Sequence, residues 1–270
     1  MKLRIYSAFL LSVIIVSCSS TQKVTVATGN QDKLLMAVSW FQHSAEMTAL
    51  YYQGFNIARQ RLDVAVDTNL SGRTLAVVVD IDETMLDNSP FETTLIKNAD
   101  SQKGWSDWTS KASARALPGA LEFAKYAQSR QVHIFYVTNR DDNERDVTIR
   151  NLQMEGFPYA TQDHLLTRSD LSYTAGNTNS KTGRRTKVAE NHEIILLIGD
   201  NLNDFSDVFE DRSINNGKDA VVKNQSQFGN RFIILPNPMY GAWEKPLYDY
   251  KEGLNDAEKT LLLKSKLIGE

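Results

Sequence analysis

The stretch Val77-Val78-Val79-Asp80-Ile81-Asp82-Glu83-Thr84 decides the fold that we predict for this chain. A run of β-branched residues is typical of a buried strand. Because burying an unpaired charge costs roughly several kcal/mol, the strand must end where the carboxylates begin. Asp80 and Asp82 then emerge at the carboxyl edge of a sheet, where ligands bind in open α/β sheets. Two anions so close need a shared proton or a cation, and a divalent metal ion is the obvious supplier.

Three further apolar segments are predicted to be strands, at residues 132–137, 194–198 and 232–235. Thr138 and Asn139 follow the first of them, and Asp200 and Asp204 follow the second. Segments with helical character alternate with the strands, which favours a parallel sheet with right-handed crossovers. We therefore predict an α/β fold, a Rossmann-like parallel sheet with helices on both faces. The polar residues would share one edge of that sheet, although Asp200 to Asp204 alone would also suit a turn that caps a helix.

Two segments outside the strands are predicted to be helical accessory parts of a domain that spans residues 33–270. Residues 33–66 carry an apolar stripe with the spacing of a helix that buries one face. Residues 90–116 lie between the first strand and the next helix and contain Trp105 and Trp108, and we predict a small helical cap here.

The first residues differ in character from the rest of the chain. Two basic residues precede a short apolar run that ends at Cys18, the only cysteine, which is typical of a signal peptide and too short for a membrane span. Ile15-Val16-Ser17-Cys18 resembles a bacterial lipobox, in which the signal peptide is removed and the cysteine is lipidated. We expect residues 1–17 to be a signal peptide and residues 18–32 a lipidated tether. A plain secretory signal with a chance cysteine is the alternative.

The strand-end motifs resemble those of the haloacid dehalogenase (HAD) superfamily of phosphatases. The first motif is similar to Asp80-Ile81-Asp82-Glu83-Thr84, the second to Val137-Thr138-Asn139-Arg140, and the fourth to Gly199-Asp200 with Asp204. Lys181 or Lys187 would supply the third. The stretches DIDETMLDNSP (80–90), GDNLNDF (199–205) and PNPMYGAWE (236–244) are similar to class C acid phosphatases. That family consists of bacterial lipoproteins and includes nucleotide-hydrolysing proteins of the outer membrane, so the resemblance implies a haloacid dehalogenase-like fold and phosphatase activity.

The chemistry of these residues agrees with phosphoryl transfer. Asp80 would attack phosphorus as a nucleophile and form an aspartyl-phosphate. A carboxylate and a phosphate dianion repel each other, and Mg²⁺, which prefers oxygen ligands, would neutralise that repulsion. We expect the side chains of Asp80 and Asp200 and the backbone carbonyl of Asp82 as metal ligands, with Asp204 orienting a metal-bound water.

The side chain of Asp82 then remains available for proton transfer. We predict that it serves as general acid toward the leaving group and as general base toward water, which implies an acidic optimum. Thr138, the backbone N–H of Asn139 and Lys181 would bind the phosphate oxygens. Lys187 competes with Lys181 for this role, and a solvated loop lysine is the plain alternative.

Aromatic residues offer a surface for the rest of the substrate. Trp105 and Tyr240 are predicted to stack against a nucleobase. Trp105 and Trp108 also have the spacing of an ordinary buried helix face, so core packing is the alternative for both.

We therefore predict a Mg²⁺-dependent acid phosphatase that hydrolyses phosphomonoesters, nucleoside 5′-monophosphates in particular. It would lie in the bacterial cell envelope, anchored through Cys18, and at the outer membrane. The formal net charge is −3 and no basic tract is present, so a nucleic-acid polymer is not an expected partner. A homodimer is compatible with the sequence. The alternatives are a surface-binding lipoprotein on a phosphatase core without catalysis, and a phosphotransferase.

Overall fold

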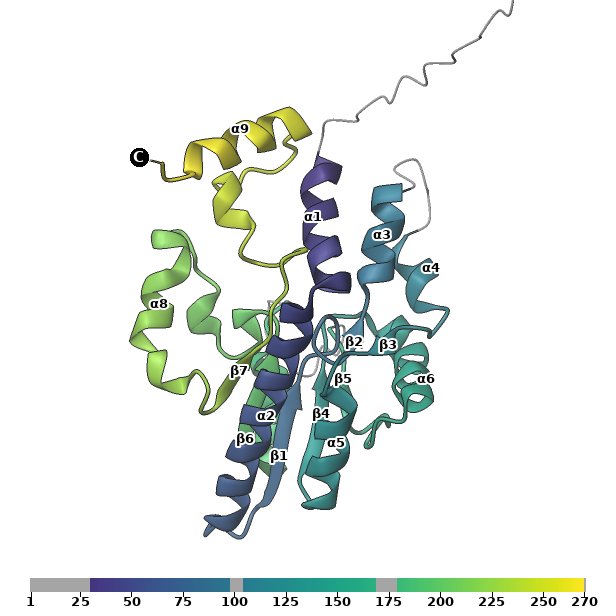
Figure 1. The fold of residues 1–270 in the computed structure, drawn as a ribbon. Helices are drawn as coiled ribbons and strands as arrows, with labels where there is room; N and C mark the ends of the chain where they lie inside the picture. Colours follow the sequence, from purple (N-terminus) through teal and green to yellow (C-terminus); the bar gives the residue numbers. More distant parts are fainter. Residues whose placement is uncertain (1–29, 98–103, 169–178, 270) are drawn as a thin grey trace, which may run out of the picture.

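The computed structural model describes residues 30–97, 104–168 and 179–269 (Figure 1). The predicted signal peptide and Cys18 lie outside the described residues, so the lipid anchor stays a prediction. None of the described helices combines the length and the apolar character that crossing a membrane requires.

A five-stranded parallel sheet forms the centre of the molecule, with the strand order β5-β4-β1-β6-β7. The strands are β1 (Thr74–Val79), β4 (His133–Val137), β5 (Leu165–Leu166), β6 (His192–Gly199) and β7 (Phe232–Ile234). Val79, the last residue of β1, pairs with Tyr136 on one side and with Ile198 on the other, so the central strands end together at one edge. The predicted parallel α/β fold is thereby confirmed. Strand β5 is not predicted from the sequence, because its two residues are too few to show a periodicity.

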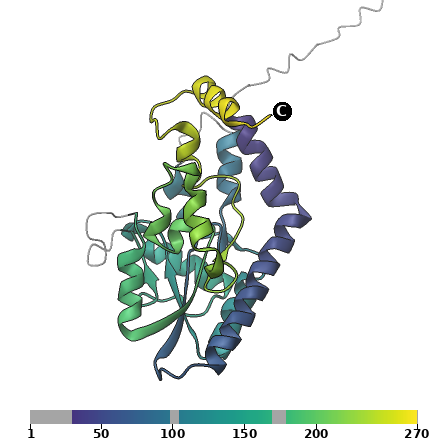
Figure 2. The same cartoon turned by 90° about the vertical axis from the view of Figure 1, so that its left-hand side faces the viewer.

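Helices cover both faces of the sheet, and alternate residues of β1 supply the two cores. Val77 and Val79 pack on the face that carries α2 (Ala45–Asp67), α5 (Ala120–Ser129) and α6 (Arg145–Glu155). Ala76 and Val78 pack on the face that carries α7 (Thr182–Asn191) and α8 (Lys218–Lys223). Figure 2 shows the sheet as a layer between these two sets of helices. Burial on both faces explains why the strands have continuous apolar sequences.

The remaining elements lie beyond the carboxyl ends of the strands. Helix α1 (Asn30–His43) packs against α3 (Ser89–Lys97), and α4 (Trp105–Thr109) lies nearby (Figure 1). Ser44 separates α1 from α2 because its side chain accepts the Met47 N–H and caps the second helix. Strands β2 (Leu86–Asp87) and β3 (Arg115–Ala116) form an antiparallel pair, and α9 (Asp256–Lys266) contacts α1. Single 3₁₀ turns occur at Asp142–Glu144, Leu202–Asp204, Asp207–Phe209, Asn215–Gly217, Gln225–Gln227 and Lys245–Tyr248.

Helices therefore occupy both regions for which the sequence predicts accessory parts. The predicted cap region contains α3, α4 and β3, and the region before β1 contains α1 and α2. The boundaries of the predicted domains stay a prediction.

Candidate active site

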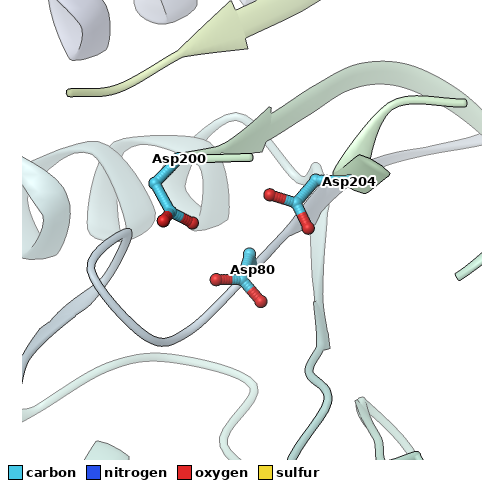
Figure 3. A group of neighbouring side chains, drawn as sticks. All are labelled: Asp80, Asp200 and Asp204. Atoms are coloured by element: carbon cyan, nitrogen blue, oxygen red, sulfur yellow. The ribbon is translucent and has the colours of Figure 1, made fainter. Parts of the chain in front are cut away.

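Three carboxylates meet at the carboxyl edge of the sheet. Asp80 follows β1, Asp200 follows β6, and Asp204 belongs to the 3₁₀ turn after β6 (Figure 3). One carboxylate oxygen from each of the three residues lies within 4.8 Å of the other two. Gly199 permits this approach, because a Cβ atom there would lie 2.6 Å from the Cβ of Asp204. The predicted juxtaposition of these strand ends is therefore present in the structure.

Lys181 lies beside these carboxylates, at the start of α7. Its Nζ forms an ion pair with Asp80 and another with Asp204, where Nζ and Oδ1 are 2.6 Å apart. Lys187 is half-buried, and its Nζ pairs with Oε2 of Glu190 at 2.9 Å. Of the two lysines that the sequence left open, the structure thus brings only Lys181 to the site.

Burial shifts the pKa values of the charged groups in this site. Burial raises the pKa of Asp80 to about 7, even though Lys181 opposes this change. Burial, and then repulsion from Asp80 and Asp204, raises the pKa of Asp200 well above its usual value. Burial alone would lower the pKa of Lys181, but Asp204 and Asp80 raise it above its usual value. Three carboxylates face one ammonium group, so a further cation would stabilise the ionised site.

The unoccupied lone pairs of the site indicate where that cation would bind. Oδ2 of Asp80 and Oδ1 of Asp200 share one neighbour, the hydroxyl of Thr84, at 3.4 Å from each. The other oxygen of Asp200 accepts a hydrogen bond of 2.8 Å from Asn237. Asp204 already has partners at both oxygens, Lys181 on one and the Asn201 N–H on the other. An all-oxygen site of this kind could hold a divalent metal ion, and Asp80 and Asp200 have the oxygens available to bind it.

Asp82 lies in different surroundings from Asp80. Its Oδ1 accepts hydrogen bonds from Nη2 of Arg140 at 2.7 Å and from Nδ2 of Asn88 at 2.8 Å. Its Oδ2 lies 3.5 Å from the hydroxyl of Thr138. Asn88 and Arg140 lie within the motifs DIDETMLDNSP and Val137-Thr138-Asn139-Arg140, but the sequence did not predict a role for either residue. No spacing rule could have identified them, because their contacts with Asp82 depend on how the chain folds back.

Two arginines of α7 hold the loops at the strand ends, Arg184 the loop after β4 and Arg185 the turn after β6. Arg184 donates to the carbonyl of Thr138 and, at 2.7 Å, to Oδ1 of Asn139. Arg185 donates to the carbonyl of Asp204 at 2.9 Å. Both side chains are buried, so α7 fixes the loops that carry the predicted phosphate-binding residues.

A cavity of about 520 Å³ opens onto these groups. Its lining includes Asp80, Asp82, Asn139, Lys181, Trp105 and Tyr240. Thr138 is fully buried and does not line the cavity. Trp108 packs against the apolar core and donates its indole N–H to Asn88 at 2.8 Å. The two tryptophans that the sequence treated alike therefore differ, since Trp105 faces the cavity and Trp108 does not line it.

Comparison with known proteins shows which family shares this arrangement. The model of the HAD superfamily, subfamily IIIB (acid phosphatase), matches residues 10–243. The chain belongs to this family. As a subfamily IIIB acid phosphatase it is a phosphomonoesterase, and the predicted family is confirmed.

Solved structures of the family have the same fold. The class C acid phosphatase from Bacillus anthracis is 41% identical, with a TM-score of 0.81 over 89% of this chain and 98% of that chain. The same enzyme with tungstate bound gives 40% identity and a TM-score of 0.80 over 89% and 99% of the two chains. Acid phosphatase 1 from Solanum lycopersicum is 26% identical over 184 residues. That match spans 65% of this chain and 62% of the tomato protein.

Proposed function

We propose that this protein is a Mg²⁺-dependent acid phosphatase that acts on nucleoside 5′-monophosphates through an aspartyl-phosphate on Asp80. The observation that carries the proposal is the group of three carboxylates at the sheet edge, two of them buried and that of Asp200 half-buried, with Lys181 beside Asp80. Burial and like charge make this group unfavourable without a cation, and phosphoryl transfer needs a cation at the same place.

The metal would be held by the side chains of Asp80 and Asp200 and the backbone carbonyl of Asp82. A bound divalent ion supplies the positive charge that lets an aspartate oxygen approach a phosphate dianion. Lys181 and the loop of Thr138 and Asn139 would bind the remaining phosphate oxygens, where negative charge accumulates in the transition state.

The reaction would proceed in two displacements. In the first, an oxygen of Asp80 forms a bond to phosphorus while the ester P–O bond breaks, and Asp82 gives its proton to the leaving oxygen. In the second, Asp82 takes a proton from water as the water oxygen bonds to phosphorus and the bond to Asp80 breaks. The products are an alcohol and inorganic phosphate, and both aspartates return to their starting states.

The volume and the lining of the cavity support a nucleotide as substrate. Its volume of about 520 Å³ is within the range of small-molecule sites. Trp105 and Tyr240 line the same cavity as the carboxylates, so an aromatic base could stack there while its phosphate reaches Asp80. In one related structure the bound oxyanion is tungstate, which has the tetrahedral shape of phosphate.

A substrate panel tests the proposal. We expect phosphate release from nucleoside 5′-monophosphates, nicotinamide mononucleotide and p-nitrophenyl phosphate at acidic pH, its loss with EDTA, and its return with Mg²⁺. No metal-dependent release from any ester would favour a binding lipoprotein without catalysis. Phosphate found on an added nucleoside instead of in solution would favour a phosphotransferase.

We also propose that the mature protein is anchored in the bacterial envelope, at the outer membrane, by a lipid on Cys18. Support comes from the lipobox-like residues Ile15-Val16-Ser17-Cys18. Metabolic labelling with a palmitate analogue should mark the wild type and leave a Cys18→Ala variant unlabelled and in the soluble fraction. A labelled Cys18→Ala variant would contradict the anchor.

A further inference from the structure

The two oxygens of the Asp82 carboxylate are bonded unequally. Oδ1 accepts from Nη2 of Arg140 at 2.7 Å, from Nε of Arg140 at 3.0 Å and from Nδ2 of Asn88 at 2.8 Å. Oδ2 has only a longer contact of 3.2 Å with Nε of Arg140 and one of 3.5 Å with the Thr138 hydroxyl. Oδ1 is thus saturated with donors, and Oδ2 retains free acceptor capacity on the side of the predicted phosphate-binding loop.

Asn88 is itself held in one orientation. It is fully buried, and its backbone N–H donates to Oε1 of Glu83 at 2.8 Å. Its side-chain Oδ1 accepts the indole N–H of Trp108 at 2.8 Å. Because an indole N–H can only donate, the amide oxygen must face Trp108 and the amide N–H₂ must face Asp82. The identity of the group on each side of Asn88 is therefore determined by its neighbours.

We propose that Asn88 is a positioning residue for the phosphatase reaction. Together with Arg140 it anchors Oδ1 of Asp82 and leaves Oδ2 as the oxygen that exchanges the proton. Trp108, on α4 of the predicted cap region, fixes the amide from behind and so connects that region to the proton-transfer group. This inference rests on the proposed role of Asp82 as general acid and base.

The inference predicts a loss of activity that depends on the leaving group. When the first P–O bond breaks, the proton moves from Oδ2 of Asp82 to the departing oxygen. A nucleoside alkoxide is a strong base and needs this proton, whereas p-nitrophenolate is a weak base and leaves without it. Misplacing Oδ2 should therefore slow nucleotides much more than p-nitrophenyl phosphate. A purely structural defect would slow both esters by the same factor.

The test compares kcat/KM for these two esters, because kcat/KM covers the steps up to loss of the alcohol. We expect Asn88→Ala to lower the value for a nucleoside 5′-monophosphate by about tenfold, which corresponds to about 1.4 kcal/mol, and the value for p-nitrophenyl phosphate by less than about threefold. Trp108→Phe, which keeps the ring and removes the donor, should shift the ratio in the same direction by a smaller factor. Equal losses on both esters in Asn88→Ala would overturn the proposal.

Two further variants separate the sources of failure. Asn151 is a buried asparagine that bonds the backbone of Ala114 and does not line the cavity, so Asn151→Ala should change stability and leave the ratio unaltered. If Asn88→Ala does not fold, Trp108→Phe decides, and an unchanged ratio of the two kcat/KM values in that variant rejects the inference.

Asp82→Asn tests the proposed function itself. An unchanged ratio in Asp82→Asn refutes its acid role, whereas a changed ratio there with equal losses in Asn88→Ala refutes only the role of Asn88.

Discussion

Asp80 and Asp82 are separated by one residue, yet they face opposite electrostatic surroundings. Asp80 lies among Asp200 and Asp204 with Lys181 as the nearest cation, and burial raises its pKa to about 7. Asp82 lies among donors and forms an ion pair with Arg140. One motif therefore supplies a carboxylate that a metal ion would stabilise and a second carboxylate that is already stabilised by the protein.

The turn after β1 produces this division. Ile81, which lies between the two aspartates in the sequence, packs into the apolar core. Its carbonyl accepts the N–H groups of Thr84, Met85 and Leu86 at 2.9 to 3.2 Å. Glu83 adopts a left-handed backbone with φ of 55°, which reverses the chain. The fixed turn directs neighbouring carboxylates to different sides, so the two roles can be tested separately.

The largest expected effect comes from removing the carboxylate on the metal side. Asp80→Asn should lower kcat by about four orders of magnitude or more on nucleotides and on p-nitrophenyl phosphate alike, because no covalent intermediate can form. Asp63→Asn makes the same chemical change at a partly exposed residue that pairs with Arg130, and it should keep wild-type rates. Steady-state kinetics on both esters measures the difference. Substantial turnover by Asp80→Asn would remove it as the nucleophile.

Replacing Lys181, the lysine that pairs with Asp80 and Asp204, should have the next largest effect. We expect Lys181→Met to lower kcat by about 10²–10³, the range for loss of one group that stabilises transition-state charge. The matched change Lys187→Met removes a half-buried lysine that pairs with Glu190, and it should alter kcat less than about twofold. Similar losses in both variants would show that Lys181 has no special place in the reaction.

Replacing Asp200 should weaken metal binding and raise the stability of the metal-free protein. Asp200→Asn removes a proposed metal ligand, so the Mg²⁺ concentration for half-maximal activity should rise at least about tenfold. The raised pKa of Asp200 means that the folded protein opposes an ionisation which the unfolded chain undergoes freely at neutral pH. The metal-free variant should therefore melt a few degrees above the metal-free wild type in calorimetry at pH 7. A lower melting temperature would contradict the predicted shortage of positive charge.

The smallest effect is expected at Glu92, which lines the same cavity as the two aspartates. Burial, and then repulsion from Glu244, raises the pKa of Glu92 to about 7 from its usual 4.5. Between these pH values the folded protein keeps a proton that the unfolded chain releases, so stability falls as pH rises through this window. Glu92→Gln should match the wild type near pH 4.5 and melt higher by about 2–4 °C at pH 8. A melting-temperature difference that does not vary with pH would reject this assignment.

Local sequence was sufficient to predict the main strands and the residues at their ends. Three β-branched residues before Asp80, and apolar runs before Thr138 and Asp200, indicate where a buried strand must stop. The choice between Lys181 and Lys187 could not be made, because both precede or lie within α7 and only the packing of that helix decides which one reaches Asp80.

Contacts between distant segments could not be predicted either, because they too depend on how the elements pack. His133, His164 and His192 lie in separate segments of the sequence, yet the fold places Nδ1 of His133 3.0 Å from Nε2 of His164 and the ring of His192 5.0 Å from that of His133. The bonds of Asn88 and Arg140 to Asp82 are of this kind too. Spacing along the chain records neighbours within one helix or strand, whereas these groups meet through the order of strands in the sheet.

Direct detection of the phosphorylated residue tests the central claim, that Asp80 accepts the phosphoryl group while Asp82 handles protons. Asp82→Asn should release p-nitrophenol from p-nitrophenyl phosphate but hydrolyse the phosphoenzyme slowly. Acid quenching followed by borohydride reduction and peptide mass spectrometry should then find homoserine at position 80. Modification at another residue, or none despite a burst of p-nitrophenol, would contradict the account.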